Sequence, residues 1–121
     1  LQESKYILPF SRFTFDEIDA NFSENTAYDY KLVLSDDLNL ELDCCSSPFD
    51  LTAIYALSSL VTHGAQRIYL VGFDGYSESD DPRNLEMTKA FKYIQNHFPE
   101  VKILSLLPSN YDVTKGSIYE Y

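Results

Sequence analysis

The sequence predicts an α/β fold, a Rossmann-like domain of three layers or an incomplete two-layer form, with a mostly parallel sheet. The first observation is an apolar run, 68–71, that stops at the Gly-x-Asp-Gly turn of residues 72–75 and predicts a central strand of a parallel sheet. The second is a pair of helical patterns on either side of this run, and the third is another apolar run at 101–107. Helix, strand, helix, strand with short connections is the pattern of right-handed βαβ crossovers.

The first thirty residues carry the weakest pattern. Residues 6–8 are apolar and precede Pro9, which predicts a short strand that ends at a turn. Residues 11–29 show no clean period, and their Asp and Asn residues favour turns with one helical turn near 15–18. We therefore expect a short strand followed by irregular structure.

Two β-favouring segments follow. Residues 30–34 form a compact apolar run, and residues 38–43 alternate apolar and polar side chains as a half-buried strand does. Asp36 and Asp37 would form the turn between them. This arrangement predicts a hairpin or an edge pairing.

The first strong helical pattern begins at Asp50, which is placed to cap the helix. Gly64 ends it, because glycine enters the left-handed conformation without steric cost. Its apolar face is expected to pack on the sheet, and comprises Leu51, Ala53, Ile54, Ala56, Leu57, Leu60 and Val61.

The second helix is expected to begin at Asp81 and Pro82, a capping residue followed by a proline in the first turn. Pro99 closes it, and the buried strand 101–107 comes next. The residues beyond Pro108 show no period. The apolar face of this helix comprises Met87, Ala90, Phe91, Ile94 and Phe98.

Length and composition indicate a single α/β domain spanning residues 1–121. The 19 acidic and 9 basic side chains give a net charge of −10, which argues against nucleic acid or a membrane surface as a partner. The two adjacent cysteines, Cys44 and Cys45, do not suit a disulfide, and the chain has no signal peptide or membrane-spanning run, so a cytoplasmic location is expected. Because the chain does not begin with Met, we interpret it as a fragment or excised domain of a longer protein, or as a processed chain.

Asp74 is the first candidate site residue, since the carboxyl end of a strand opens into the crevice where α/β sheets bind ligands. Gly72 and Gly75 would let a ligand approach the backbone. Asp74, Asp80 and Asp81 are a possible magnesium set that would share the ion with substrate phosphates. The alternative is that Asp74 binds turn amides, Asp81 caps a helix and Asp80 is solvated.

Gly75, Arg83 and Asn84 complete the expected ligand site. Arg83 and Asn84 lie in the first turn of the second helix, where free backbone amides favour anions. With Asp74 they would bind a hydroxylated or phosphorylated ligand. Alternatively, Arg83 forms a surface ion pair with Glu86 or Asp80.

Other motifs mainly exclude functions. His63 and His97 fall in the last turns of the two helices, where we expect them to cap, and no zinc-ligand spacing exists. Cys44 and Cys45 are expected to be buried, with a nucleophilic thiolate as the alternative. The chain has no Gly-x-Ser-x-Gly, Gly-x-Gly-x-x-Gly or phosphate-loop motif, and no residue is assigned as catalytic.

The stretches 50–57, 64–75 and 81–87 resemble the C-terminal, Rossmann-like accessory domain of bacterial aldolase-like proteins. Those proteins join it to a barrel similar to the hydroxymethylglutaryl-CoA lyase and 4-hydroxy-2-oxovalerate aldolase family, and often belong to surface-polysaccharide synthesis. The Gly-Ala-x-x-Ile-x-Leu-x-Gly-x-Asp pattern is also similar to 6-hydroxymethylpterin diphosphokinase-like domains and to bacterial sialyltransferases.

The first resemblance implies an auxiliary, noncatalytic domain whose parent protein is a lyase. It implies a sugar or nucleotide-sugar ligand, docking to a missing N-terminal portion, and no cofactor in this domain. Any magnesium or other divalent metal would lie in the barrel of the parent protein. The alternatives are a nucleotide- or pyrophosphate-dependent transferase half-domain, which needs a glycine-rich segment upstream, and a structural module that forms a homo-oligomer through its tyrosine-rich ends.

Overall fold

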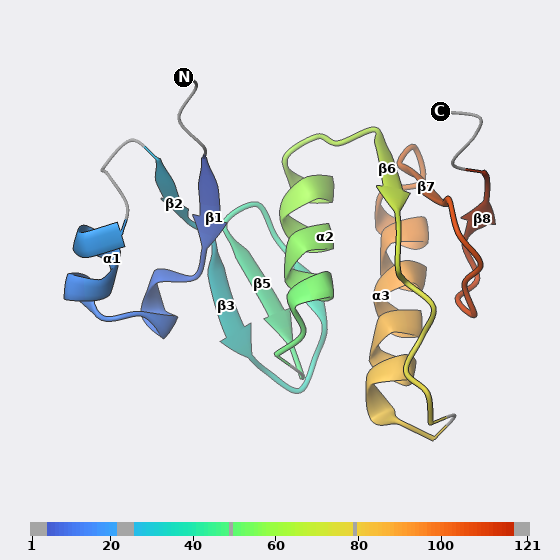
Figure 1. Cartoon of the computed structure of the whole chain (residues 1–121), viewed down its shortest axis with the longest axis horizontal. Coiled ribbons are helices and arrows are strands. Elements are labelled where there is room, and N and C mark those ends of the chain that lie inside the picture. The colour runs from blue at the N-terminus through green and yellow to red at the C-terminus, as the bar shows by residue number, and fades with distance from the viewer. Residues whose placement is uncertain (1–4, 22–25, 49, 79, 118–121) are drawn as a thin grey trace.

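The computed structural model describes residues 5–21, 26–48, 50–78 and 80–117. Helices and strands are mixed along the chain, and most paired strands run parallel, which confirms an α/β fold (Figure 1). The elements in chain order are β1 (Tyr6–Leu8), the 3₁₀ helix η1 (Phe10–Arg12), α1 (Phe15–Asn21), β2 (Ala27–Asp29), β3 (Lys31–Leu34), β4 (Asn39–Leu40), β5 (Cys44–Ser47), α2 (Thr52–Thr62), β6 (Arg67–Leu70), α3 (Pro82–His97), β7 (Lys102–Ser105) and β8 (Thr114–Lys115).

The strands of the N-terminal half, β1 to β5, form two groups that are joined at Tyr30. β1 pairs with β2 in parallel, while β3 pairs in parallel with β5 and β5 pairs antiparallel with β4. The Tyr30 amide donates to the Leu8 carbonyl at 3.2 Å, and the next amide, of Lys31, donates to the Asp43 carbonyl at 3.1 Å. Because neighbouring amides point to opposite edges of a strand, β2 and β3 continue one another, with β1 on one edge and β5 on the other.

Of the hairpin or edge pairing expected around Asp36 and Asp37, the hairpin is wrong, and the second segment instead pairs at a sheet edge, as β4 beside β5. Those residues lie in a bend, but Leu32 on β3 is in register with Cys45 on β5. The strand expected at 38–43 shrinks to the two residues of β4, and Leu42 is 64% exposed. Burial decides the pairing, since Cys45 and Ser47 on β5 are almost completely buried.

The C-terminal half contains the predicted βαβ unit. β6 and β7 pair in parallel from Arg67 opposite Lys102 to Leu70 opposite Ser105, and α3 connects them. β8 adds a parallel pair on the far side of β7. The expected central position of the first apolar run is therefore corrected: within the described residues β7 is central and β6 lies at the edge.

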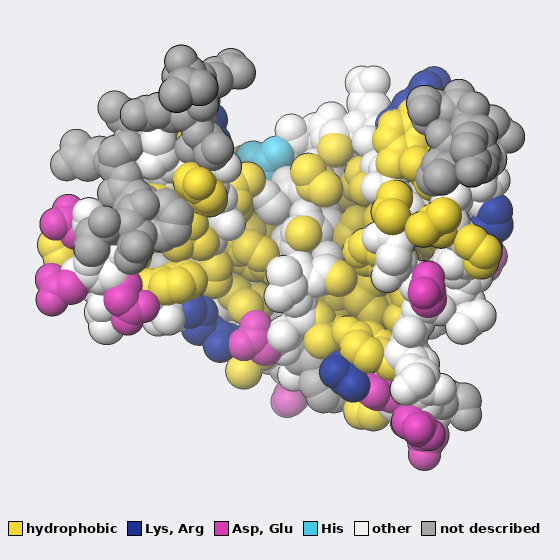
Figure 2. Space-filling view, in the orientation of Figure 1, with side chains coloured by type: hydrophobic (Ala, Val, Ile, Leu, Met, Phe, Trp, Pro, Cys, Tyr) yellow, Lys and Arg dark blue, Asp and Glu magenta, His cyan; other side chains and the backbone are white. Residues whose placement is uncertain are grey.

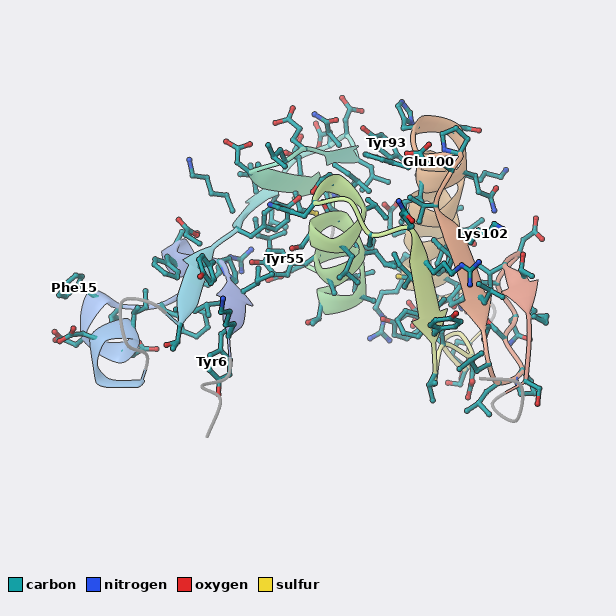
Figure 3. The ribbon with its side chains drawn as sticks, turned by 90° about the horizontal axis from the view of Figure 1, so that it is seen from above. Tyr6, Phe15, Tyr55, Tyr93, Glu100 and Lys102 are labelled. Atoms are coloured by element: carbon teal, nitrogen blue, oxygen red, sulfur yellow. The ribbon has the colours of Figure 1, made fainter. Side chains whose placement is uncertain are left out.

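α2 lies between the two groups of strands (Figures 1 and 3). The described strands of the two halves are not hydrogen-bonded into one sheet, so α2 and the side chains around it connect the halves. Buried residues from both halves form one hydrophobic cluster, which comprises Tyr30, Leu40, Cys45, Ile54, Tyr55, Leu57, Val61, Ile68, Leu70, Met87, Ala90, Phe91, Ile94 and Tyr111.

The ends of the helices show which capping predictions hold. Asp81 caps α3, since its side chain accepts a hydrogen bond from the Arg83 amide at 2.9 Å. At the start of α2 the prediction is wrong, because Leu51 is the N-cap residue and Asp50 pairs with Arg12 at 2.6 Å. Asp50 is drawn to this guanidinium, which comes from a segment 38 residues earlier in the chain.

Gly64 ends α2 as expected, with φ at +94°. The amide of the next residue, Ala65, donates to the Leu60 carbonyl at 3.0 Å, and the Gly64 amide donates to the Val61 carbonyl at 3.4 Å. These two bonds form a Schellman motif, which satisfies carbonyls that the helix leaves without a partner.

The segment expected to be mostly turns contains more regular structure than its sequence pattern predicts, in two elements. β2 is the first, and α1 is longer than the single helical turn expected near 15–18. A capping box begins α1: the Glu17 amide donates to the Thr14 hydroxyl at 3.2 Å, and the Glu17 carboxylate accepts from the Thr14 amide at 3.4 Å.

No helix in the described part of the chain is both long and apolar enough to cross a membrane.

Candidate functional site

The candidate site lies where β6 and β7 end and α3 begins. The Leu106 amide donates to the Leu70 carbonyl at 2.9 Å, which keeps the two segments of the chain side by side where β6 and β7 end. Further along, the Asn110 amide donates to the Asp74 carbonyl at 3.2 Å. The loop after β6 and the loop after β7 therefore form one edge, as expected for the carboxyl ends of neighbouring parallel strands.

Asp74 is exposed on this edge. Its carboxylate makes no hydrogen bond or ion pair with any described residue, so the alternative in which it binds turn amides finds no support. It borders an open hollow of about 360 Å³. The other residues that line this hollow are Leu107, Pro108, Ser109 and Asn110.

Gly75 has the close approach that the sequence predicts, but its neighbours are side chains of the protein itself. Its φ is +104°, and a Cβ placed on it would lie 3.4 Å from Asn84 Oδ1 and 3.6 Å from Asn110 Cβ. A larger residue would be strained here by its backbone conformation. Gly75 therefore lets the two loops and α3 come together.

Asn84 holds this arrangement together. Its Oδ1 accepts hydrogen bonds from the Tyr76 amide at 2.8 Å and from the Tyr111 hydroxyl at 3.1 Å. Its Nδ2 donates to the carbonyls of Tyr76 at 3.2 Å and Glu78 at 3.0 Å. Both atoms of the amide are thus used within the protein, and Asn84 positions the site more than it offers groups to a ligand.

Arg83 is also engaged, with a partner that sequence reasoning did not name. Its Nε and Nη2 donate to the Asp81 carboxylate at 3.0 and 2.7 Å, and its guanidinium lies 4.0 Å from the centre of the Tyr76 ring. The expected pairing with Glu86 or Asp80 is wrong, because the cap geometry of Asp81 already brings its carboxylate to Arg83. Hydrogen bonding from Arg83 lowers the pKa of Asp81 below its ordinary value.

A second hollow, of about 230 Å³, lies between the first turn of α2 and the loop after β6. Figure 2 shows hydrophobic side chains exposed between α2 and this loop. Tyr111 closes one wall, and its ring packs 5.4 Å from that of Phe91. The remaining lining residues are Ala53, Gly72, Phe73, Gly75, Tyr76 and Met87.

The residues that follow β7 also belong to this edge, although their sequence pattern was not taken as a sign of a site. Ser109 donates through its hydroxyl to the Phe73 carbonyl, and the Tyr111 amide donates to the Ser109 hydroxyl at 3.2 Å. Like Asp74, Ser109 and Asn110 are polar residues just beyond a buried parallel strand. Their position after Pro108 was the available signal.

The described residues contain no group of three or more His, Cys, Asp or Glu side chains arranged to hold a metal ion. In the suggested magnesium set, Asp81 is bonded to Arg83. His63 and His97 cap their helices as expected, through Nδ1 contacts of 2.7 and 3.0 Å with the Ser59 and Tyr93 carbonyls. The described structure thus leaves Asp74 as the carboxylate of the set that faces the hollow.

Comparisons with models of known protein families, with curated proteins and with solved structures found no match to this chain.

Proposed function

We propose that this chain is an auxiliary ligand-binding domain, Rossmann-like in its layering, that binds a sugar or nucleotide-sugar ligand at the edge beyond β6 and β7. The observation that carries the proposal is the exposed Asp74 carboxylate, which lies beside a hollow formed by two converging loops. Open α/β sheets bind ligands at this edge. A carboxylate and an amide side chain are suitable partners for hydroxyl groups.

The braced surroundings of Asp74 support the same proposal. Asn84 uses both ends of its amide to fix the loop after β6, and the Asp74 carbonyl is itself bonded to the Asn110 amide. A site held in advance loses less entropy when a ligand binds. The Asp74 carboxylate is thus presented by a backbone that is already positioned.

Ligand binding can be tested by following backbone amide signals in NMR spectra while monosaccharides, CMP-sugars and CTP with magnesium are added separately. We expect shifts in residues 72–76 and 106–111, and a loss of binding in Asp74→Asn and Asn110→Ala. Asp112→Asn is the matched control, since it removes an exposed carboxylate outside the hollow. Shifts elsewhere, or equal effects of all three substitutions, would contradict the proposal.

We further propose that the parent protein is an aldolase-like enzyme of carbohydrate synthesis, with its aldolase site outside this chain. This part rests on the sequence resemblance of 50–57, 64–75 and 81–87. The gene sequence upstream of the codon for Leu1 is the direct test. A barrel-coding region supports the proposal, whereas a glycine-rich nucleotide-binding half supports the transferase alternative.

Self-association is the second candidate function. β6 pairs only with β7 among the described strands, and apolar residues are exposed nearby, with Val71 58% and Leu60 45% accessible. Exposed apolar surface beside an edge strand is a feature of contact surfaces. Sedimentation equilibrium of wild type and Val71→Lys tests this function: a wild-type dimer that the substitution dissociates supports it, and a monomer at high concentration contradicts it.

A further inference from the structure

The charges around the candidate site are mostly negative. The loop from β6 to α3 carries Asp74, Glu78, Asp80 and Asp81, and Arg83 is the one basic residue from 74 to 84. Glu78 and Asp80 are exposed, and Figure 2 shows acidic side chains gathered at the far end of this loop, at the lower right of the molecule. An anion that approaches the hollow therefore meets a net negative field.

The basic side chains near the site are already occupied. The Arg83 guanidinium binds both oxygens of Asp81 and covers the Tyr76 ring. Lys115 donates to the Tyr111 carbonyl, on the chain that follows β7. A phosphate group would have to displace Asp81 from Arg83 before it could form a paired contact with the guanidinium.

The groups left for a ligand are of a different kind. The Asp74 carboxylate accepts hydrogen bonds, and the hollow that it borders has aliphatic walls from Leu107 and Pro108. Carboxylate acceptors suit the hydroxyl groups of a sugar ring, and apolar walls suit its C–H groups. None of these groups carries a positive charge that would balance a dianionic phosphate.

From this charge distribution we infer that the site selects an uncharged polyol, such as a monosaccharide, and disfavours the phosphate ester of the same sugar. The inference rests on the proposed function, because it assumes that a ligand binds beside Asp74. It deepens that function by naming the chemical class of the group in contact with the protein. In this proposal the Asp81 carboxylate occupies the Arg83 guanidinium, which is then not available to bind an anion.

The test compares matched ligands: glucose with glucose 6-phosphate, and N-acetylglucosamine with its 6-phosphate. Affinities are measured by NMR titration of the whole chain at low and at physiological salt. We expect each neutral sugar to bind more tightly than its ester, with a smaller difference at higher salt because exposed charges are screened. Tighter binding of the esters would overturn the inference and leave the proposed function intact. No binding of any of the four ligands would overturn the inference, whereas the proposed function is decided separately by its own titration with CMP-sugars and CTP.

Asp81→Asn sharpens the test, since asparagine caps a helix about as well as aspartate but does not hold the guanidinium by charge. Glucose 6-phosphate should bind roughly fivefold more tightly to this variant than to wild type. Asp80→Asn is the matched control, because it removes the same charge from the same loop and keeps Arg83 paired. A smaller gain in the control supports the inference. Weaker or unchanged ester binding in Asp81→Asn would overturn it.

Discussion

At the scale of single residues, the sequence identifies which side chains lie at the site better than it identifies the groups to which they bond. Asp74 was selected by its position after a strand, and the structure places it exposed at that edge. Arg83 and Asn84 were selected by the same reasoning, yet both side chains bond within the protein. The difference arises because a partner depends on side-chain geometry within a folded turn, which spacing in the sequence does not specify.

Glu86 on α3 carries a buried carboxylate, with 4% of the residue exposed, and its replacement should change the stability of the protein. One oxygen accepts from Lys89 at 3.3 Å, and the other has no hydrogen-bond partner in the described structure. Glu86→Met should therefore raise the free energy of unfolding by about 1–2 kcal/mol, measured by urea denaturation. Glu86→Gln is the control and should give no such gain, since it keeps a buried polar group. A loss of stability in Glu86→Met would show that the carboxylate is satisfied in solution.

The two cysteines should differ in reactivity. Cys45 is fully buried, and burial raises the pKa of its thiol to about 11, which argues against the nucleophilic alternative for this residue. At pH 8 a thiol reagent should modify Cys44 in the native protein and both cysteines after unfolding. Cys44→Ser should then show no native reaction. Rapid native modification of Cys45 would contradict its buried position.

The raised pKa also gives a dependence of stability on pH. The Cys45 thiol ionises more easily in the unfolded chain, near its ordinary value of 9.0, than in the folded protein. Its contribution is therefore fully present below pH 9 and is lost as the pH rises towards 11. Unfolding measured across this window should show a smaller decline in Cys45→Ala than in wild type.

At the scale of elements, the helix and strand patterns of the C-terminal half are predicted well, and their ends are decided by capping. Asp81 and Gly64 follow local rules, so their roles could be read from neighbouring residues. Asp50 has the right residue type for a cap but is held by Arg12 from a distant segment. The capping box of α1 was present in the sequence as Thr14 and Glu17, and overlooking it led to the expectation of a single turn.

Gly64 provides the test of the α2 terminus. Its φ of +94° disfavours any residue with a Cβ, even though no atom lies within 4 Å of the position a Cβ would take. Gly64→Ala should destabilise the protein by about 1 kcal/mol, measured as a change in the free energy of thermal or urea unfolding. Gly116→Ala is the control, because φ of Gly116 is not positive. Equal effects of the two substitutions would argue against the left-handed terminus.

At the scale of the whole molecule, the two halves meet through α2, α3 and their side chains. Figure 3 shows Tyr93 on the side of α3 that faces the N-terminal sheet, and its hydroxyl donates to Asn39 Oδ1 on β4 at 2.9 Å. This bond joins residues 54 positions apart in the sequence. Such contacts hold together strands that do not form one hydrogen-bonded sheet.

Tyr93→Phe tests this link between the halves. It removes the hydroxyl but keeps the ring stacked on His97, at 4.0 Å between ring centres. We expect a loss of about 1 kcal/mol in stability and faster amide hydrogen exchange in β4. Tyr28→Phe, at a half-exposed tyrosine, should change neither quantity. Unchanged exchange in β4 would show that the bond does not hold the halves together.

The sequence by itself determined α2, α3, β6 and β7, together with the edge at which Asp74 lies. Periodicity, caps and glycines act within a few residues, so they can be read along the chain. Only the tertiary structure decided that β3 pairs with β5, that β6 lies at an edge, and that Arg83 is held by Asp81. These outcomes depend on burial and on side-chain geometry in the folded chain, where several pairings compatible with the same local pattern compete and the best-packed arrangement prevails.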